Sequence, residues 1–61
     1  MPDLLDQIMD YESGKLNADG EIRLFAELIR TGTAWKLQGA YGRNAAALIR
    51  AGYIDERGNI Q

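Results

Sequence analysis

Glycine residues set the length of every helix that this chain can form. Apolar residues recur with helical spacing in several stretches, and each stretch ends at or just before a glycine: Gly14, Gly32, Gly39 and Gly52. A glycine just past the last periodic residue is typical of a helix C-terminus. The sequence therefore predicts an all-α domain, a compact bundle of three to four short helices.

The first half of the chain predicts two of these helices. Pro2 suits a first turn, and a stripe of apolar residues follows it at helical spacing to about residue 12: Leu4, Leu5, Ile8 and Met9. Asn17 can cap the second helix, whose apolar face is wide and ends before Gly32: Ile22, Phe25, Leu28 and Ile29, with Leu24 beside them.

The second half predicts a short helix from Thr33 to Gln38, a break at residues 39–42, and a helix over residues 43–51. A single helix over residues 33–51 is the alternative, but it would carry Gly39 and Gly42 at a cost of about 1 kcal/mol each. The predicted break makes this half resemble a helix-turn-helix, although Trp35 stands where that motif usually has a small residue.

After Gly52, the segment Asp55-Glu56-Arg57-Gly58 suits a type I turn with a left-handed glycine. Apolar residues flank this turn, so a C-terminal turn or mini-hairpin is expected.

With 61 residues, the chain is one small domain, residues 1–61, and such a chain buries roughly 60% of its unfolded surface. We expect ten residues in the core: Leu5, Ile8, Ile22, Phe25, Leu28, Ile29, Trp35, Leu48, Ile49 and Ile54. A core of this size favours self-association, so a homodimer is expected.

The chain contains no cysteine and no histidine, which removes disulfides and the usual zinc sites. It also lacks a nucleophile–base pair and a phosphate-binding loop. We therefore expect neither an enzyme nor a bound metal or cofactor.

Charge is divided unevenly along the chain. Residues 1–27 carry seven carboxylates and two bases, a net charge of −5, whereas residues 28–61 carry five bases and two carboxylates, a net charge of +3. The division reflects either helices that balance one another or two faces for different partners. The acidic isoelectric point, about 4.8, argues against nucleic acid as the partner.

The candidate binding residues gather between residues 35 and 50: Trp35, Lys36, Tyr41, Arg43, Ala47 and Arg50. Aromatic and arginine side chains are enriched in protein interfaces, and small residues allow close approach. We expect a protein partner. The alternatives are DNA read by the last helix and a nucleotide held by Tyr41 and Arg43. Trp35 could instead be a core anchor, and Tyr41 a surface residue that covers the loop.

No apolar run is long enough to cross a bilayer, and the N-terminus is acidic, unlike a secretory signal. A cytoplasmic protein is therefore expected.

Several runs of residues also carry a resemblance. The runs at residues 4–14, 24–32 and 48–54, and above all Trp35-Lys36-Leu37-Gln38-Gly39-Ala40-Tyr41-Gly42-Arg43, resemble a family of small proteins encoded by tailed bacteriophages. The resemblance implies expression in an infected bacterial cytoplasm, where small proteins often bind host machinery or neutralise a defence system. It assigns no site residue.

Overall fold

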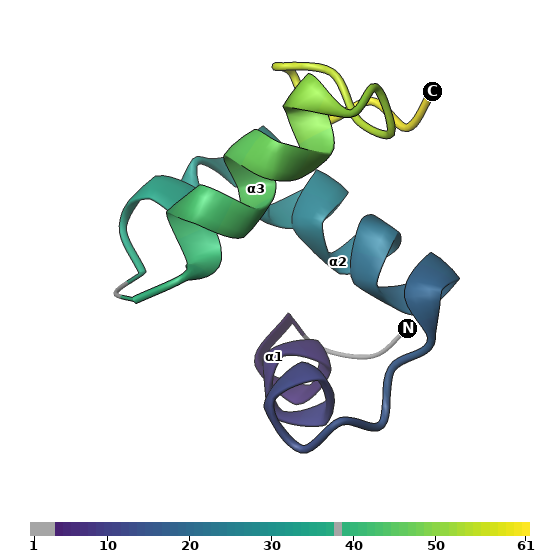
Figure 1. Ribbon diagram of the computed structural model, residues 1–61. Helices are drawn as coiled ribbons and strands as arrows, with labels where there is room; N and C mark the ends of the chain where they lie inside the picture. Colours follow the sequence, from purple (N-terminus) through teal and green to yellow (C-terminus); the bar gives the residue numbers. More distant parts are fainter. Residues whose placement is uncertain (1–3, 38) are drawn as a thin grey trace.

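The computed structural model describes residues 4–37 and 39–61, which form three α-helices and one 3-10 turn (Figure 1). In chain order these are α1 (Leu4–Glu12), α2 (Ala18–Thr31), the 3-10 turn η1 (Thr33–Trp35) and α3 (Tyr41–Arg50). The described residues form no β-strand, so the all-α prediction is confirmed. Of the predicted residues, Pro2 and Gln38 lie outside the described part of the chain.

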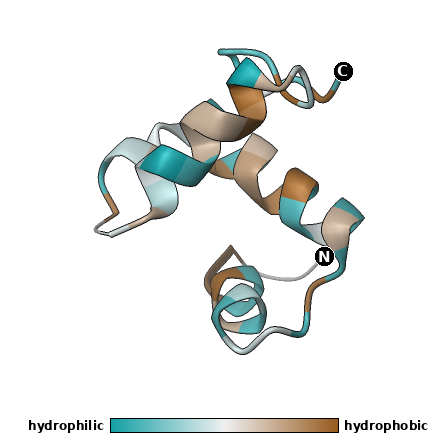
Figure 2. Ribbon diagram, in the orientation of Figure 1, coloured by the Kyte–Doolittle hydropathy of each residue, from teal (hydrophilic) through white to brown (hydrophobic). Residues whose placement is uncertain are grey.

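Helix α2 is the centre of the fold, and α1, η1 and α3 all pack against it (Figure 1). Its start is fixed by Asn17, whose side chain accepts a hydrogen bond from the Gly20 amide at 2.8 Å. It ends at Gly32, which has a left-handed φ of 79°. Hydrophobic and hydrophilic residues alternate along α1 and α2, as expected for amphipathic helices (Figure 2). No described helix is long and apolar enough to cross a membrane.

The core consists of one face of α2 and a few residues that close over it. Its buried members are Leu24, Phe25, Ala26, Leu28, Ile29, Ala34, Ala45 and Ile54. The prediction was right for Phe25, Leu28, Ile29 and Ile54, and four more predicted core residues are partly buried against this cluster: Ile8, Ile22, Leu48 and Ile49.

Two predicted core residues are instead exposed. Leu5 is 61% exposed because α1 packs mainly on α2, so only one edge of its apolar stripe is covered. Trp35 is 54% exposed because the preceding residue, Ala34, is the one that faces the core.

The segment before α3 also differs from the prediction. Residues 33–35 form a single 3-10 turn rather than a short α-helix. The break occurs at Gly39, which has a φ of 76°, but α3 already begins at Tyr41 and includes Gly42. Gly42 was therefore wrongly assigned to the break, because its backbone is helical.

The C-terminal segment forms the predicted mini-hairpin, with an antiparallel bridge between Ile54 and Ile60. Asp55 organises the turn: its Oδ1 accepts hydrogen bonds from the Arg57 amide at 2.9 Å and the Asn59 amide at 2.8 Å. These hydrogen bonds, those from Asn59 above all, lower the pKa of the Asp55 carboxyl. The hairpin places Ile54 in the core and Gly58 against α2.

Candidate protein-binding surface

The exposure of Trp35 follows from how η1 is anchored. The turn is closed by hydrogen bonds from the Trp35 amide to the Gly32 carbonyl and from the Lys36 amide to the Thr33 carbonyl. Ala34 is fully buried in the core beneath it. In so tight a turn, the neighbour of an inward residue faces a different direction. The indole of Trp35 is therefore directed out of the core.

The indole lies beside α3 and forms one wall of an open groove. Trp35, Ala46, Ile49, Arg50 and Glu56 line a space of about 470 Å³. The approach to α3 is close, since a Cβ added at Gly42 would lie 3.7 Å from Cε3 of the indole. The groove is thus lined by one aromatic, two aliphatic and two charged side chains.

Arg43 and Arg50 lie seven residues apart on α3, which places them on the same side of the helix about two turns apart. Ala46 and the exposed Ala47 lie between them on that side. Among the described residues, neither arginine forms an ion pair; the one ion pair found there joins Arg30 to Glu27. We call the set Trp35, Arg43, Ala46, Ile49 and Arg50 the Trp35 face.

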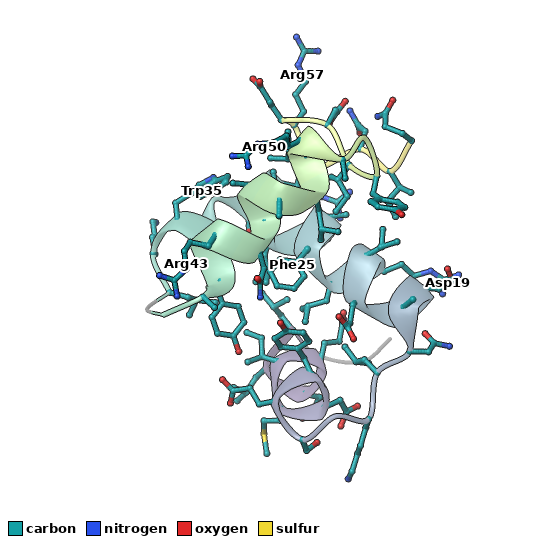
Figure 3. All side chains as sticks on the ribbon, viewed as in Figure 1. Asp19, Phe25, Trp35, Arg43, Arg50 and Arg57 are labelled. Carbon is teal, nitrogen blue, oxygen red and sulfur yellow. The ribbon has the colours of Figure 1, made fainter. Side chains whose placement is uncertain are left out.

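The Trp35 face lies on one side of the molecule. Figure 3 shows Trp35, Arg43 and Arg50 together along η1 and α3, at the opposite side of the view from Asp19 at the start of α2. Of the predicted binding residues, Trp35, Arg43, Ala47 and Arg50 are thus brought together. Lys36 is exposed and follows Trp35 in the chain, and it is not among the residues that line the groove.

Tyr41 lies elsewhere and has an internal role. Its hydroxyl donates a hydrogen bond to Oε2 of Glu12 on α1 at 2.6 Å. Its ring packs at 5.8 Å from the ring of Tyr11 and 6.1 Å from that of Phe25, measured between centroids. Burial, followed by the hydrogen bond and the negative charge of Glu12, raises the pKa of Tyr41 to about 12. The side chain joins α3 to α1.

Three groove residues were not among the predicted binding residues. Ala46 could have been found, because it lies on the side of α3 that carries Arg43 and Arg50. Ile49 was expected to face inward, and it is partly buried while also lining the groove. Glu56 comes from the C-terminal hairpin, and no spacing in the sequence indicates that the hairpin returns to α3.

Within residues 4–37 and 39–61, no three metal-ligating side chains gather at one point. The fold and this surface define a small helical domain with one aromatic and basic face. The chain belongs to the family described as domain of unknown function DUF7417, which it matches over residues 1–61. Comparisons with curated proteins and with solved structures gave no match.

Proposed function

We propose that this chain is a non-enzymatic accessory protein that binds another protein through the Trp35 face. The observation that carries the proposal is Trp35 itself, a large aromatic side chain that remains 54% exposed in a domain with a small core. Tryptophan and arginine are the residues that most often dominate the binding energy of protein interfaces. Here Trp35 lies beside a groove that Arg50 also lines.

The chemistry of the face indicates the kind of segment that it binds. An apolar side chain fits the groove between the indole and α3. Carboxylates on the same segment can pair with Arg43 and Arg50, whose guanidinium groups form two hydrogen bonds with a carboxylate. The small side chains of Ala46 and Ala47 let a partner backbone approach α3 closely. The partner segment is thus acidic and carries at least one apolar anchor.

The resemblance to small proteins of tailed bacteriophages supports a bacterial setting for the partner. In that setting the partner is a host or phage protein in the cytoplasm of an infected cell. Binding would act by covering a surface of that partner, for example to inhibit host machinery or a defence system.

DNA is the second candidate, because the two unpaired arginines lie on the exposed side of the last helix of a helix-turn-helix-like segment. Two observations disfavour it. A single 3-10 turn stands before α3, where the motif has an α-helix. The face also carries few bases, and the chain as a whole is acidic. A nucleotide site at Tyr41 is also disfavoured. The Tyr41 hydroxyl already donates its hydrogen bond to Glu12, whose negative charge would repel a phosphate.

The test is a tagged pull-down from infected bacterial cells with three variants. Arg43→Glu combined with Arg50→Glu should abolish capture of the partner, and Trp35→Ala should weaken it by about 30-fold or more, as for a hot-spot residue. Arg23→Glu is the matched control, since Arg23 is exposed on α2 away from the face. Circular dichroism should show the same helical signal for all three.

Capture of the same partner by the double reversal would refute the proposed face. Retention of the wild-type protein on immobilised DNA, lost in the double reversal and in raised salt, would favour the second candidate.

A further inference from the structure

Helix α1 has an outer face that no described element covers. Leu5 and Met9 are 61% and 58% exposed, while Leu4, Ile8 and Tyr11 on the other side of the helix pack against the core. Asp6 and Asp10 follow Leu5 and Met9 directly, and residues at this spacing share one side of a helix. We call Leu5, Asp6, Met9 and Asp10 the acidic face.

The carboxylates of the acidic face have no partner among residues 4–37 and 39–61. The side chains of Asp6 and Asp10 accept no hydrogen bond there and form no ion pair. The face therefore offers two exposed apolar side chains beside two unpaired negative charges.

The acidic face matches the chemistry that the Trp35 face requires. One face has apolar side chains beside carboxylates, and the other has an aromatic groove beside arginines. The helices that carry them have similar lengths, nine residues in α1 and ten in α3. The uneven charge of the two halves of the chain then has a physical role, because opposite potentials steer two surfaces together.

We propose that the acidic face of one copy of this chain binds the Trp35 face of a second copy. The inference rests on the proposed function in treating the Trp35 face as a binding surface, and it names a second copy as an occupant. The two faces are different surfaces, so one such contact leaves the Trp35 face of the first copy and the acidic face of the second copy free. The contact closes into a dimer where both copies use both faces, and otherwise it continues from copy to copy.

This contact would also regulate partner binding. A copy whose Trp35 face is covered by the α1 of its neighbour cannot bind a foreign segment there. Self-association and partner binding therefore compete, and partner binding should fall as the protein concentration rises. Salt should weaken the self-contact, because exposed charges are screened at high ionic strength.

The experiment measures the self-association constant by sedimentation equilibrium of the whole chain. One variant combines Asp6→Lys with Asp10→Lys, so that both of its faces are basic. A second combines Arg43→Glu with Arg50→Glu, so that both of its faces are acidic. Each variant alone should associate at least about tenfold more weakly than the wild type, since like charges now meet. A one-to-one mixture should associate again, because each basic face then meets an acidic one.

The matched control combines Asp19→Lys with Arg23→Glu, two exposed residues of α2 outside both faces, and it should associate as the wild type does. Circular dichroism checks that every variant is folded. A wild-type chain that stays monomeric at high micromolar concentration would overturn the inference. So would a mixture that remains monomeric when both variants are folded.

Failure of this inference and failure of the proposed function give different results. If the Asp6 and Asp10 variant associates normally while the Arg43 and Arg50 variant loses the foreign partner, the self-contact is wrong and the proposed function holds. If the mixture restores association but no variant or wild-type protein captures a partner, the self-contact holds and the proposed function fails.

Discussion

At the scale of single residues, Gly58 decides how the C-terminal hairpin lies on α2. Its φ is 90°, a left-handed value that side chains rarely adopt, and a Cβ there would lie 2.5 Å from the carbonyl oxygen of Ala26. The same Cβ would lie 2.9 Å from the backbone nitrogen of Arg30. Two independent requirements thus select glycine at one position, one from the turn and one from the contact with α2.

We predict that Gly58→Ala destabilises the protein more than Gly14→Ala does. Gly14 has a similar φ of 77° but no atom within 4 Å of an added Cβ. Its substitution should cost only the backbone strain, about 1–2 kcal/mol. Gly58→Ala adds a collision with backbone atoms that cannot move without shifting the hairpin. Urea unfolding measures both losses, and equal losses would mean that the hairpin moves freely on α2.

Features held by near neighbours in the chain could be predicted from the sequence. The Asn17 cap, the left-handed Gly32 and the turn at residues 55–58 each depend on partners within a few residues. The exposure of Trp35 could not be predicted in this way. A large aromatic side chain is usually buried in a small domain. Only the anchoring of Ala34 in the core directs the indole of Trp35 outward.

At the scale of elements, the three α-helices meet through one aromatic cluster. Tyr11 of α1, Phe25 of α2 and Tyr41 of α3 contribute one ring each, and the rings of Tyr11 and Phe25 meet edge to face at 5.4 Å. Asn44 of α3 adds a hydrogen bond to the Tyr11 hydroxyl at 2.9 Å. Together with the hydrogen bond from Tyr41 to Glu12, the cluster connects α1 to α3.

We predict that stability falls at high pH and that Tyr41 is responsible. The pKa of Tyr41 is raised from 10.0 to about 12 in the folded chain, so folding favours the protonated phenol. Its contribution is therefore complete below pH 10 and is lost as the pH rises from 10 to 12. Melting temperatures across this range should fall less steeply in Tyr41→Phe, which has no phenol to ionise. Parallel profiles in the two proteins would assign the loss to other groups.

The apolar stripes in the sequence predicted that α1 and α2 are helices. They did not predict how much of each apolar stripe is covered by neighbouring elements. The stripe on α1 is wide enough for two neighbours, yet α2 is the main element packed on it, which leaves Leu5 and Met9 exposed. Conversely, Ala34 and Ala45 are fully buried because η1 and α3 approach closely at small side chains. A periodic pattern shows which side of a helix is apolar, whereas coverage depends on where other elements end.

At the scale of the whole molecule, a small core leaves much apolar surface outside. The described chain has a radius of gyration of 10.4 Å, and a domain of this size cannot enclose every large apolar side chain. Among residues 4–37 and 39–61, five large apolar side chains remain more than half exposed: Leu5, Met9, Trp35, Tyr53 and Ile60. The core therefore consists mainly of residues of α2, and these five exposed residues lie outside it.

This division predicts different effects on stability for two aromatic truncations, one in the core and one on the surface. Phe25 is 1% exposed at the centre of the core, so Phe25→Ala should cost about 3–5 kcal/mol. That loss is close to the whole stability of a small domain, so the helical signal in circular dichroism should largely disappear. Trp35→Ala should leave the helical signal largely intact and lower the melting temperature far less than Phe25→Ala does, because more than half of the indole already contacts solvent. A comparable loss of structure in both variants would make Trp35 a core residue, and the surface defined by it would no longer be available to a partner.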